Sequence, residues 1–320
     1  MGKVQYTVVT TYYKLIRKLR SAGIEPSPQA LRTAADTFAT LYPMPMNTRL
    51  EMIQLGGRPC GLVSHRIPKT NDVFVFIHGG GFAFGSVRTH RVAVAHLCKM
   101  TGMRGYIPEY RLTPEHPYPA ALNDVESAWN DLLKTFPSHA IHLIGDSAGG
   151  NLAAALVHRL KNKGRRLPAS LILMSPWLDL APDSPSAVKN RDEDSLFDKN
   201  DLIHYSRFYI GDSNFNDPDL SPLRADVDGF PPTLVQVAEN ELLYFDSLAL
   251  IEKLKDADVE HEVIVEHNLF HSWQLFPDFI PEAKQSLQQA ADFILKIRKA
   301  ALQQHEQSET TPVESTAASV

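Results

Sequence analysis

The sequence has very little cysteine, with only Cys60 and Cys98 among its 320 residues. Two cysteines cannot form the disulfide framework of a small secreted domain, and they fit a reducing cytoplasmic setting, which is the location we expect. Long apolar runs are also missing, since no stretch reaches the roughly 18 to 20 apolar residues that a membrane-spanning helix needs. Residues 1–23 contain no apolar core of the signal-peptide type. We therefore expect a protein without a membrane span.

An excess of positive charge is missing as well. The chain has 32 basic and 37 acidic residues, which gives a formal net charge of −5. Proteins that bind nucleic acid usually carry a strongly basic surface, so we expect no nucleic-acid partner. The remaining composition, with 43% apolar and 22% charged residues, is typical of a globular chain that is large enough to bury a core.

Short apolar runs alternate with helical patterns from about residue 50 onward. The strand-like runs lie at residues 73–77, 140–144, 170–174, 233–237 and 263–265. The helical patterns lie at residues 88–101, 119–135, 149–163, 245–257 and 282–300. Short apolar strands separated by helices predict an α/β fold, with a mostly parallel sheet and helices on both faces. Ligands of such sheets bind beyond the carboxyl ends of the strands, so the loops after these runs should carry the chemistry.

Three parts of the chain depart from this alternation. Residues 1–45 have apolar groups at helical spacing and are expected to form N-terminal cap helices. Residues 178–222 are rich in Asp, Ser, Asn and Pro, and we expect a cap insertion there with one or two helices over the sheet. The hydrolase-like core would then comprise residues 46–177 and 223–301. Residues 302–320 have few apolar anchors and are expected to form a disordered tail.

The segment Gly145-Asp146-Ser147-Ala148-Gly149 matches the pattern G-x-S-x-G between a strand-like run and a helical one. A serine on such a tight turn points into the cleft, and the N-terminus of the following helix favours negative charge that develops beside it. The alternative is a glycine-rich turn with an incidental serine. We expect Ser147 to be a nucleophile.

A second glycine-rich segment, His78-Gly79-Gly80-Gly81-Phe82, directly follows the strand-like run 73–77. Glycines let backbone N–H groups approach a small anion, such as the oxygen of a tetrahedral intermediate. No Gly-Lys-Ser or Gly-Lys-Thr follows, which excludes a nucleotide-binding P-loop. An HGGG segment upstream of G-x-S-x-G is the pairing expected in lipases and esterases.

Three segments together resemble the hormone-sensitive-lipase-like family of α/β-hydrolases, in its bacterial family IV carboxylesterase branch. They are HGGGF at 78–82, YRLTPEHP at 110–117 and GDSAGGN at 145–151. The resemblance covers about residues 50–300 and implies an α/β-hydrolase fold with an eight-stranded sheet and a helical cap.

The same resemblance implies ester hydrolysis without a cofactor or a metal. By motif position, it assigns the oxyanion-hole N–H groups to Gly80, Gly81 and Ala148. Dimers are common in the family, which leaves a homodimer open.

A serine nucleophile needs a histidine base, and the triad order expected here is serine, acid, histidine. Of the 13 histidines, His261, His267 and His271 are the ones that lie next to the last strand-like run. His261 precedes the last strand-like run, at the wrong end of the sheet. His271 lies in the loop between that run and the closing helix, and its surroundings resemble the FH-x-aromatic segment of the family. We expect His271 to be the base, with His267 as the alternative.

The acid departs from the D-x-L segment that the family usually has. The carboxylates that follow the run 233–237 are Glu239, Glu241 and Asp246. Glu241 is the expected acid, because Leu243 stands two places after it and thirty residues separate it from His271. A glutamate is an accepted triad acid. The alternative register would place Asn240 there, whose amide could not stabilise an imidazolium.

These patterns predict a serine carboxylester hydrolase, or carboxylesterase, whose partner is a small-molecule ester with a short- to medium-chain acyl group. Two alternatives remain. An amidase or acyltransferase would use the same triad, and a non-catalytic ligand-binding protein would share only the fold. The presence of the histidine favours the enzyme.

Overall fold

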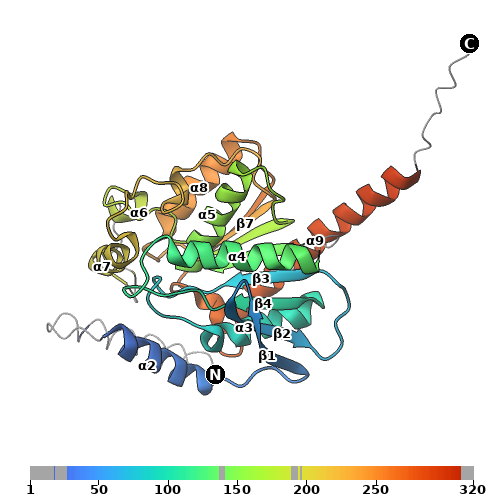
Figure 1. The fold of residues 1–320 in the computed structure, drawn as a ribbon, viewed down its shortest axis with the longest axis horizontal. Helices are drawn as coiled ribbons and strands as arrows, with labels where there is room; N and C mark the ends of the chain where they lie inside the picture. Colours follow the sequence, from blue (N-terminus) through green and yellow to red (C-terminus); the bar gives the residue numbers. More distant parts are fainter. Residues whose placement is uncertain (1–17, 19–26, 137–140, 189–193, 195–196, 311–320) are drawn as a thin grey trace, which may run out of the picture.

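One sheet lies at the centre of the computed structural model, which describes Lys18 and residues 27–136, 141–188, 194 and 197–310 (Figure 1). Its strand order is β1-β2-β4-β3-β5-β6-β7-β8. The strands are β1 (Thr48–Leu55), β2 (Arg58–His65), β3 (Val73–Ile77), β4 (Arg104–Pro108), β5 (Ile141–Asp146), β6 (Ser170–Met174), β7 (Thr233–Ala238) and β8 (His261–Glu266). β2 pairs antiparallel with β1 and β4, and the other pairs are parallel. The predicted mostly parallel, eight-stranded sheet is confirmed.

The central strands β3, β5, β6 and β7 are buried along their whole length. Helices cover both faces of a parallel sheet, so such strands are continuously apolar and easy to recognise. The edge hairpin of β1 and β2 is different. It turns at Gly56 and Gly57, whose φ values of 60° and 78° suit a two-residue hairpin loop. Neither this hairpin nor β4 was among the predicted runs.

Helices pack on the two faces of the sheet in two separate cores. The helices are α2 (Pro28–Thr40), α3 (Val87–Thr101), α4 (Ala120–Thr135), α5 (Ala148–Asn162), α6 (Pro185–Val188), α7 (Lys199–Ile210), α8 (Tyr244–Asp256) and α9 (Pro281–Thr310), with 3₁₀ turns η1 (Pro222–Arg224) and η2 (Trp273–Leu275). One core contains Trp129, Leu156 and Leu254 from α4, α5 and α8. The other contains Leu97 of α3 and Phe293 of α9. The five predicted core helices all form.

The regions expected to form a cap contain α2, α6 and α7, and Figure 1 shows α2 and α7 at the same side of the core. Ser27 is the N-cap of α2, and its hydroxyl accepts a hydrogen bond from the N–H of Ala30. The N-terminal helix expected before α2 lies outside the described residues, apart from Lys18. The division of the chain into cap and core stays a prediction.

In the tail expected to be disordered, residues 302–310 differ from the prediction, because α9 continues to Thr310. Residues 311–320 lie outside the described residues. The segment from Ala301 to Thr310 lacks glycine and proline, and seven of its ten residues are Ala, Leu, Gln or Glu. Such residues favour helix and nothing stops it, although few apolar groups anchor the segment. No helix in the described part of the chain is long and apolar enough to cross a membrane.

Candidate active site

Ser147 lies on the turn between β5 and α5, with φ of 52° and ψ of −122°. A non-glycine residue in this region is strained, so surrounding contacts must hold it there. The N–H of Ser147 donates to the carbonyl of Met174 at 2.9 Å, and the N–H of Trp177 donates to the carbonyl of Ser147 at 3.1 Å. A Cβ at Gly149 would lie 2.0 Å from the carbonyl oxygen of Ile77, so only glycine lets α5 begin this close to β3.

The structure brings Ser147, His271 and Glu241 together from the carboxyl ends of β5, β8 and β7. The Oγ of Ser147 lies 2.8 Å from Nε2 of His271, and Nδ1 of His271 lies 3.2 Å from Oε2 of Glu241. All three residues are buried, and Glu241 is 1% exposed. The arrangement can pass a proton from the hydroxyl to an imidazole whose cationic form faces a carboxylate.

The alternative residues lie elsewhere. Glu239 pairs with His267 at 2.5 Å, where the imidazole is largely exposed. Asn240 accepts a hydrogen bond from the N–H of Asn268. His261 begins β8, at the end of the strand opposite to His271. None of these groups replaces a member of the Ser147, His271 and Glu241 chain.

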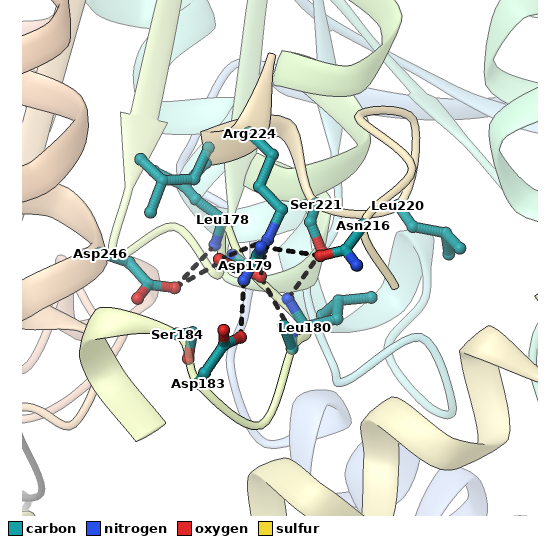
Figure 2. A network of polar contacts seen from close by, with 12 residues as sticks. Leu178, Asp179, Leu180, Asp183, Ser184, Asn216, Leu220, Ser221, Arg224 and Asp246 are labelled. Atoms are coloured by element: carbon teal, nitrogen blue, oxygen red, sulfur yellow. Dashed lines mark hydrogen bonds and ion pairs between the residues drawn. The ribbon is translucent and has the colours of Figure 1, made fainter. Parts of the chain in front are cut away.

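Asp246 lies in the first turn of α8, and its carboxylate points at another segment (Figure 2). It accepts hydrogen bonds from the backbone N–H groups of Leu178, Asp179 and Ser186, at 3.2, 3.1 and 3.0 Å. Asp246 therefore fixes the chain around α6.

Glu241 and His271 set the proton affinity of the site. Burial alone would lower the pKa of His271, but the hydrogen bond and charge of Glu241, together with the charges of Asp194 and Asp146, outweigh burial and raise that pKa above its usual value. Burial raises the pKa of Glu241, and the neighbouring imidazole offsets part of this increase. The imidazole is therefore a stronger base than a free histidine.

The glycine loop after β3 lies against the same cavity as Ser147 and His271. Gly80 has a φ of 113°, and its carbonyl accepts hydrogen bonds from the N–H groups of Ala83 and Phe84, both at 3.0 Å. Ala148 is the first residue of α5, where N–H groups have no partner inside the helix. No described residue accepts a hydrogen bond from the N–H of Gly80, Gly81 or Ala148.

Asp146 connects the glycine loop, the serine turn and the histidine loop, a position that sequence reasoning missed. Its Oδ1 accepts the N–H of Gly79 at 2.8 Å and lies 3.0 Å from Nε2 of His90. Its Oδ2 accepts the hydroxyl of Ser272 at 3.2 Å. Burial would raise the pKa of Asp146, but His90 and the Gly79 N–H outweigh burial and lower it. The only signal in the sequence was its place next to Ser147.

Arg32 attaches α2 to the loops around the site. Its guanidinium donates to the carbonyls of Ala83 and Thr113, at 2.8 and 2.7 Å, and pairs with Glu115 at 2.7 Å. Glu115 belongs to the YRLTPEHP segment, whose Arg111 pairs with Asp124 at 2.8 Å. Arg32 therefore connects α2 to the loops around the site, and Arg111 connects the YRLTPEHP segment to α4.

Two cavities adjoin Ser147 and His271. The larger has a volume of about 120 Å³ and is lined in part by Phe38 and Tyr42 from the α2 region. The smaller has a volume of about 20 Å³ and extends toward α7. Among the described residues, no group of three or more His, Cys, Asp or Glu side chains could hold a metal ion.

Comparison with known proteins identifies the family of this chain. Residues 74–275 match the family model described as the alpha/beta hydrolase fold. An esterase of Acinetobacter venetianus is 36% identical over 91% of this chain and 98% of its own length. An acetyl-hydrolase of Streptomyces hygroscopicus is 33% identical over 92% and 97%. A crystal structure of an esterase from the bacterial hormone-sensitive lipase family is 34% identical over 89% of this chain and 96% of that one, with a TM-score of 0.80. The chain therefore belongs to the α/β-hydrolase family, in its hormone-sensitive-lipase-like branch of carboxylesterases.

Proposed function

We propose that the chain hydrolyses esters of short- to medium-chain acyl groups through a triad of Ser147, His271 and Glu241. The observation that carries this proposal is the chain of contacts from Oγ to Nε2 at 2.8 Å and from Nδ1 to Oε2 at 3.2 Å. A nucleophile, a base and an orienting acid at such distances are the arrangement that acyl transfer requires.

The first half-reaction forms an acyl-enzyme. His271 takes the proton of the Ser147 hydroxyl as Oγ attacks the ester carbonyl, and Glu241 stabilises the imidazolium that results. The N–H groups of Gly80, Gly81 and Ala148 would bind the oxyanion, which is supported by their lack of another acceptor in the described part of the chain. The intermediate collapses as His271 gives the proton to the leaving alcohol. In the second half-reaction, His271 takes a proton from water as the water oxygen attacks the acyl carbonyl. The bond from the acyl carbon to Oγ then breaks, and His271 returns the proton to Oγ, which releases the acid.

The narrow space beside Ser147 supports small acyl groups. The smaller cavity, of about 20 Å³, is close to the ~10–15 Å³ that holds one water molecule. An acetyl methyl fits such a space better than a long chain does. The Streptomyces relative is named an acetyl-hydrolase, in agreement with this substrate class.

The test compares the parent protein with Ser147→Ala on p-nitrophenyl esters of increasing acyl length. The parent should turn over acetate and butyrate best, and the variant should lose activity by on the order of 10⁵- to 10⁶-fold while it stays folded. A fluorophosphonate should label the parent once and the variant not at all. Labelling that persists in Ser147→Ala would place the nucleophile elsewhere. Faster turnover of the matching p-nitroanilides would favour an amidase.

A further inference from the structure

Two cavities on the α7 side of the candidate active site share the lining residues Trp177 and Leu202. The smaller cavity described above, here called the acyl pocket, is lined by Ser147, His271, Trp177, Leu202 and neighbouring residues. A second cavity of about 440 Å³, here called the side chamber, lies between the 177–187 segment and α7. Trp177 and Leu202 are the two residues that line both cavities. They therefore form the wall between a very small pocket and a much larger space.

The two wall residues are held differently. Trp177 is 3% exposed, its Nε1 donates to the carbonyl of Asp179 at 3.1 Å, and its ring lies 5.8 Å from that of Phe82. Leu202 is only partly buried on α7, and an aliphatic side chain has no polar group that could fix it. Trp177 is thus held in the wall by a hydrogen bond as well as by packing, whereas the side chain of Leu202 is held by packing alone. Leu202 is therefore the wall residue that we choose to shorten.

A polar network keeps the far wall of the side chamber in place (Figure 2). Arg224 pairs with Asp179 at 3.0 Å and with Asp183 at 2.7 Å, and the N–H of Leu180 donates to the hydroxyl of Ser221 at 3.0 Å. Asp246 binds the same segment from α8. These contacts hold the 177–187 segment to η1 and α8.

The lining of the side chamber suits an alkyl chain. Nine of its sixteen lining residues are apolar, and they include Leu180, Ile203, Ile210 and Phe215, while its basic lining residues Lys199 and Arg207 are exposed to solvent. An alkyl chain gains free energy when it moves from water into such surroundings.

The acyl group of the ester, and not its alcohol, is the part that we assign to the acyl pocket. In a two-step mechanism the acyl group stays on the serine while the alcohol departs. The cavity beside α2 extends to the exposed Arg88, so an alcohol can leave there. The acyl pocket is lined by buried residues that include Tyr205, Leu242 and Leu243.

We propose that Leu202 limits acyl length by separating the acyl pocket from the side chamber, which is a latent binding site for alkyl chains longer than those that the parent accepts best. The proposal rests on the proposed esterase function.

The test is Leu202→Ala, assayed on p-nitrophenyl acetate, butyrate, octanoate and decanoate. The ratio of kcat/KM for octanoate to kcat/KM for acetate should rise at least ~10-fold over the parent, since each methylene that moves into an apolar space gains roughly four-fold in binding. The matched control is Ile203→Ala, because Ile203 lines the side chamber but not the acyl pocket. That variant should keep the parent ratio for octanoate to acetate.

The ratio within one variant does not depend on how much of the protein is folded. Leu202→Val serves as a milder substitution if Leu202→Ala loses all activity. An unchanged ratio in an active variant would overturn the proposal. So would a gain seen only when the alcohol of an acetate ester is lengthened, because this would place the alcohol on the α7 side. Failure of the parent to hydrolyse acetate would instead contradict the proposed function.

Discussion

Glu241 shows how a single residue can depart from a family pattern and keep the geometry. In the proposed triad it takes the place where the family usually has aspartate, and its longer side chain still places Oε2 at 3.2 Å from Nδ1 of His271. The extra methylene is accommodated because Glu241 lies in a loop, where the backbone can shift more easily than in a helix. The side chain is also enclosed, so its charge acts on the imidazole with little screening by water.

Removal of the Glu241 charge should change both the rate and its pH dependence. Glu241→Gln should lower kcat by roughly 10²- to 10⁴-fold, because the imidazole loses its orienting charge. His271 must be neutral to accept a proton, and Glu241 raises its pKa. Activity of the parent should therefore fall as the pH drops through a value above 6.5, and this acid limb should move to lower pH in the variant. The measurement is kcat/KM against pH on p-nitrophenyl acetate.

Glu239→Gln is the matched control for this experiment, since Glu239 pairs with His267 at the surface. It should keep the parent rate and the parent acid limb. A near-normal kcat in Glu241→Gln would mean that another group orients His271.

Among the elements, α2 forms one side of the active site and depends on a few contacts with the core. Phe38, Ala39 and Tyr42 line the larger cavity, and Arg32 holds the helix to the loops at Ala83 and Thr113. The helix has an apolar face but little core of its own, since Ala39 is its one buried residue. A short helix of this kind is stabilised by its packing and not by its propensity.

Deletion of residues 1–45 should lower kcat/KM for esters by at least ~10-fold, because one wall of the cavity is lost and orientation of the bound substrate weakens. Deletion of the residues after 303 should leave kcat/KM unchanged, since α9 is already exposed at Ala301, Leu302 and Gln303, the last residues that would be kept. Activity and melting temperature of both truncated proteins, measured in parallel, test this difference. Equal effects of the two deletions would contradict the role given to α2.

The elements that the sequence predicted well are those whose physics is local. Buried parallel strands are continuous apolar runs, and the helices between them have a clear period. The edge hairpin was missed although Gly56-Gly57 is a hairpin signal, because β1 is largely exposed and its apolar residues do not form a run. Ser147, His271 and Glu241 could be named because each follows a predicted strand. The role of Asp146 and the side chamber depend on contacts between segments far apart in the sequence, which no local pattern contains.

At the scale of the whole molecule, buried neutral histidines connect stability to pH. Burial lowers the pKa of His78 to about 3 and that of His142 to about 4. His78 stacks on Tyr110 with ring centroids 4.2 Å apart, and Nδ1 of His142 lies 2.7 Å from the hydroxyl of Ser170. In the unfolded chain both imidazoles would take up a proton near their usual pKa of ~6.5. Their contribution to stability is therefore present above pH 6.5 and is lost as the pH falls toward the folded pKa values.

The free energy of unfolding should accordingly fall by about 1.4 kcal/mol per pH unit for each of these histidines below pH 6.5. Asp246 acts in the opposite direction, since burial raises its pKa to about 6 and the folded state gains stability as Asp246 is protonated. Over this interval His78 and His142 together outweigh Asp246, so the combined contribution of these three groups should be a loss of stability.

His142→Gln isolates one of these contributions, because glutamine can keep a hydrogen bond to Ser170 but cannot be protonated. Urea unfolding at pH 7.5, 6.5 and 5.5 should show a smaller decrease in the variant than in the parent, by about 1 kcal/mol between pH 6.5 and 5.5. His116→Gln, at an exposed position, is the control and should retain the parent slope. Equal slopes for the parent and His142→Gln would show that His142 takes up its proton at the same pH in the folded and the unfolded chain, and acid sensitivity would then have to arise from other groups.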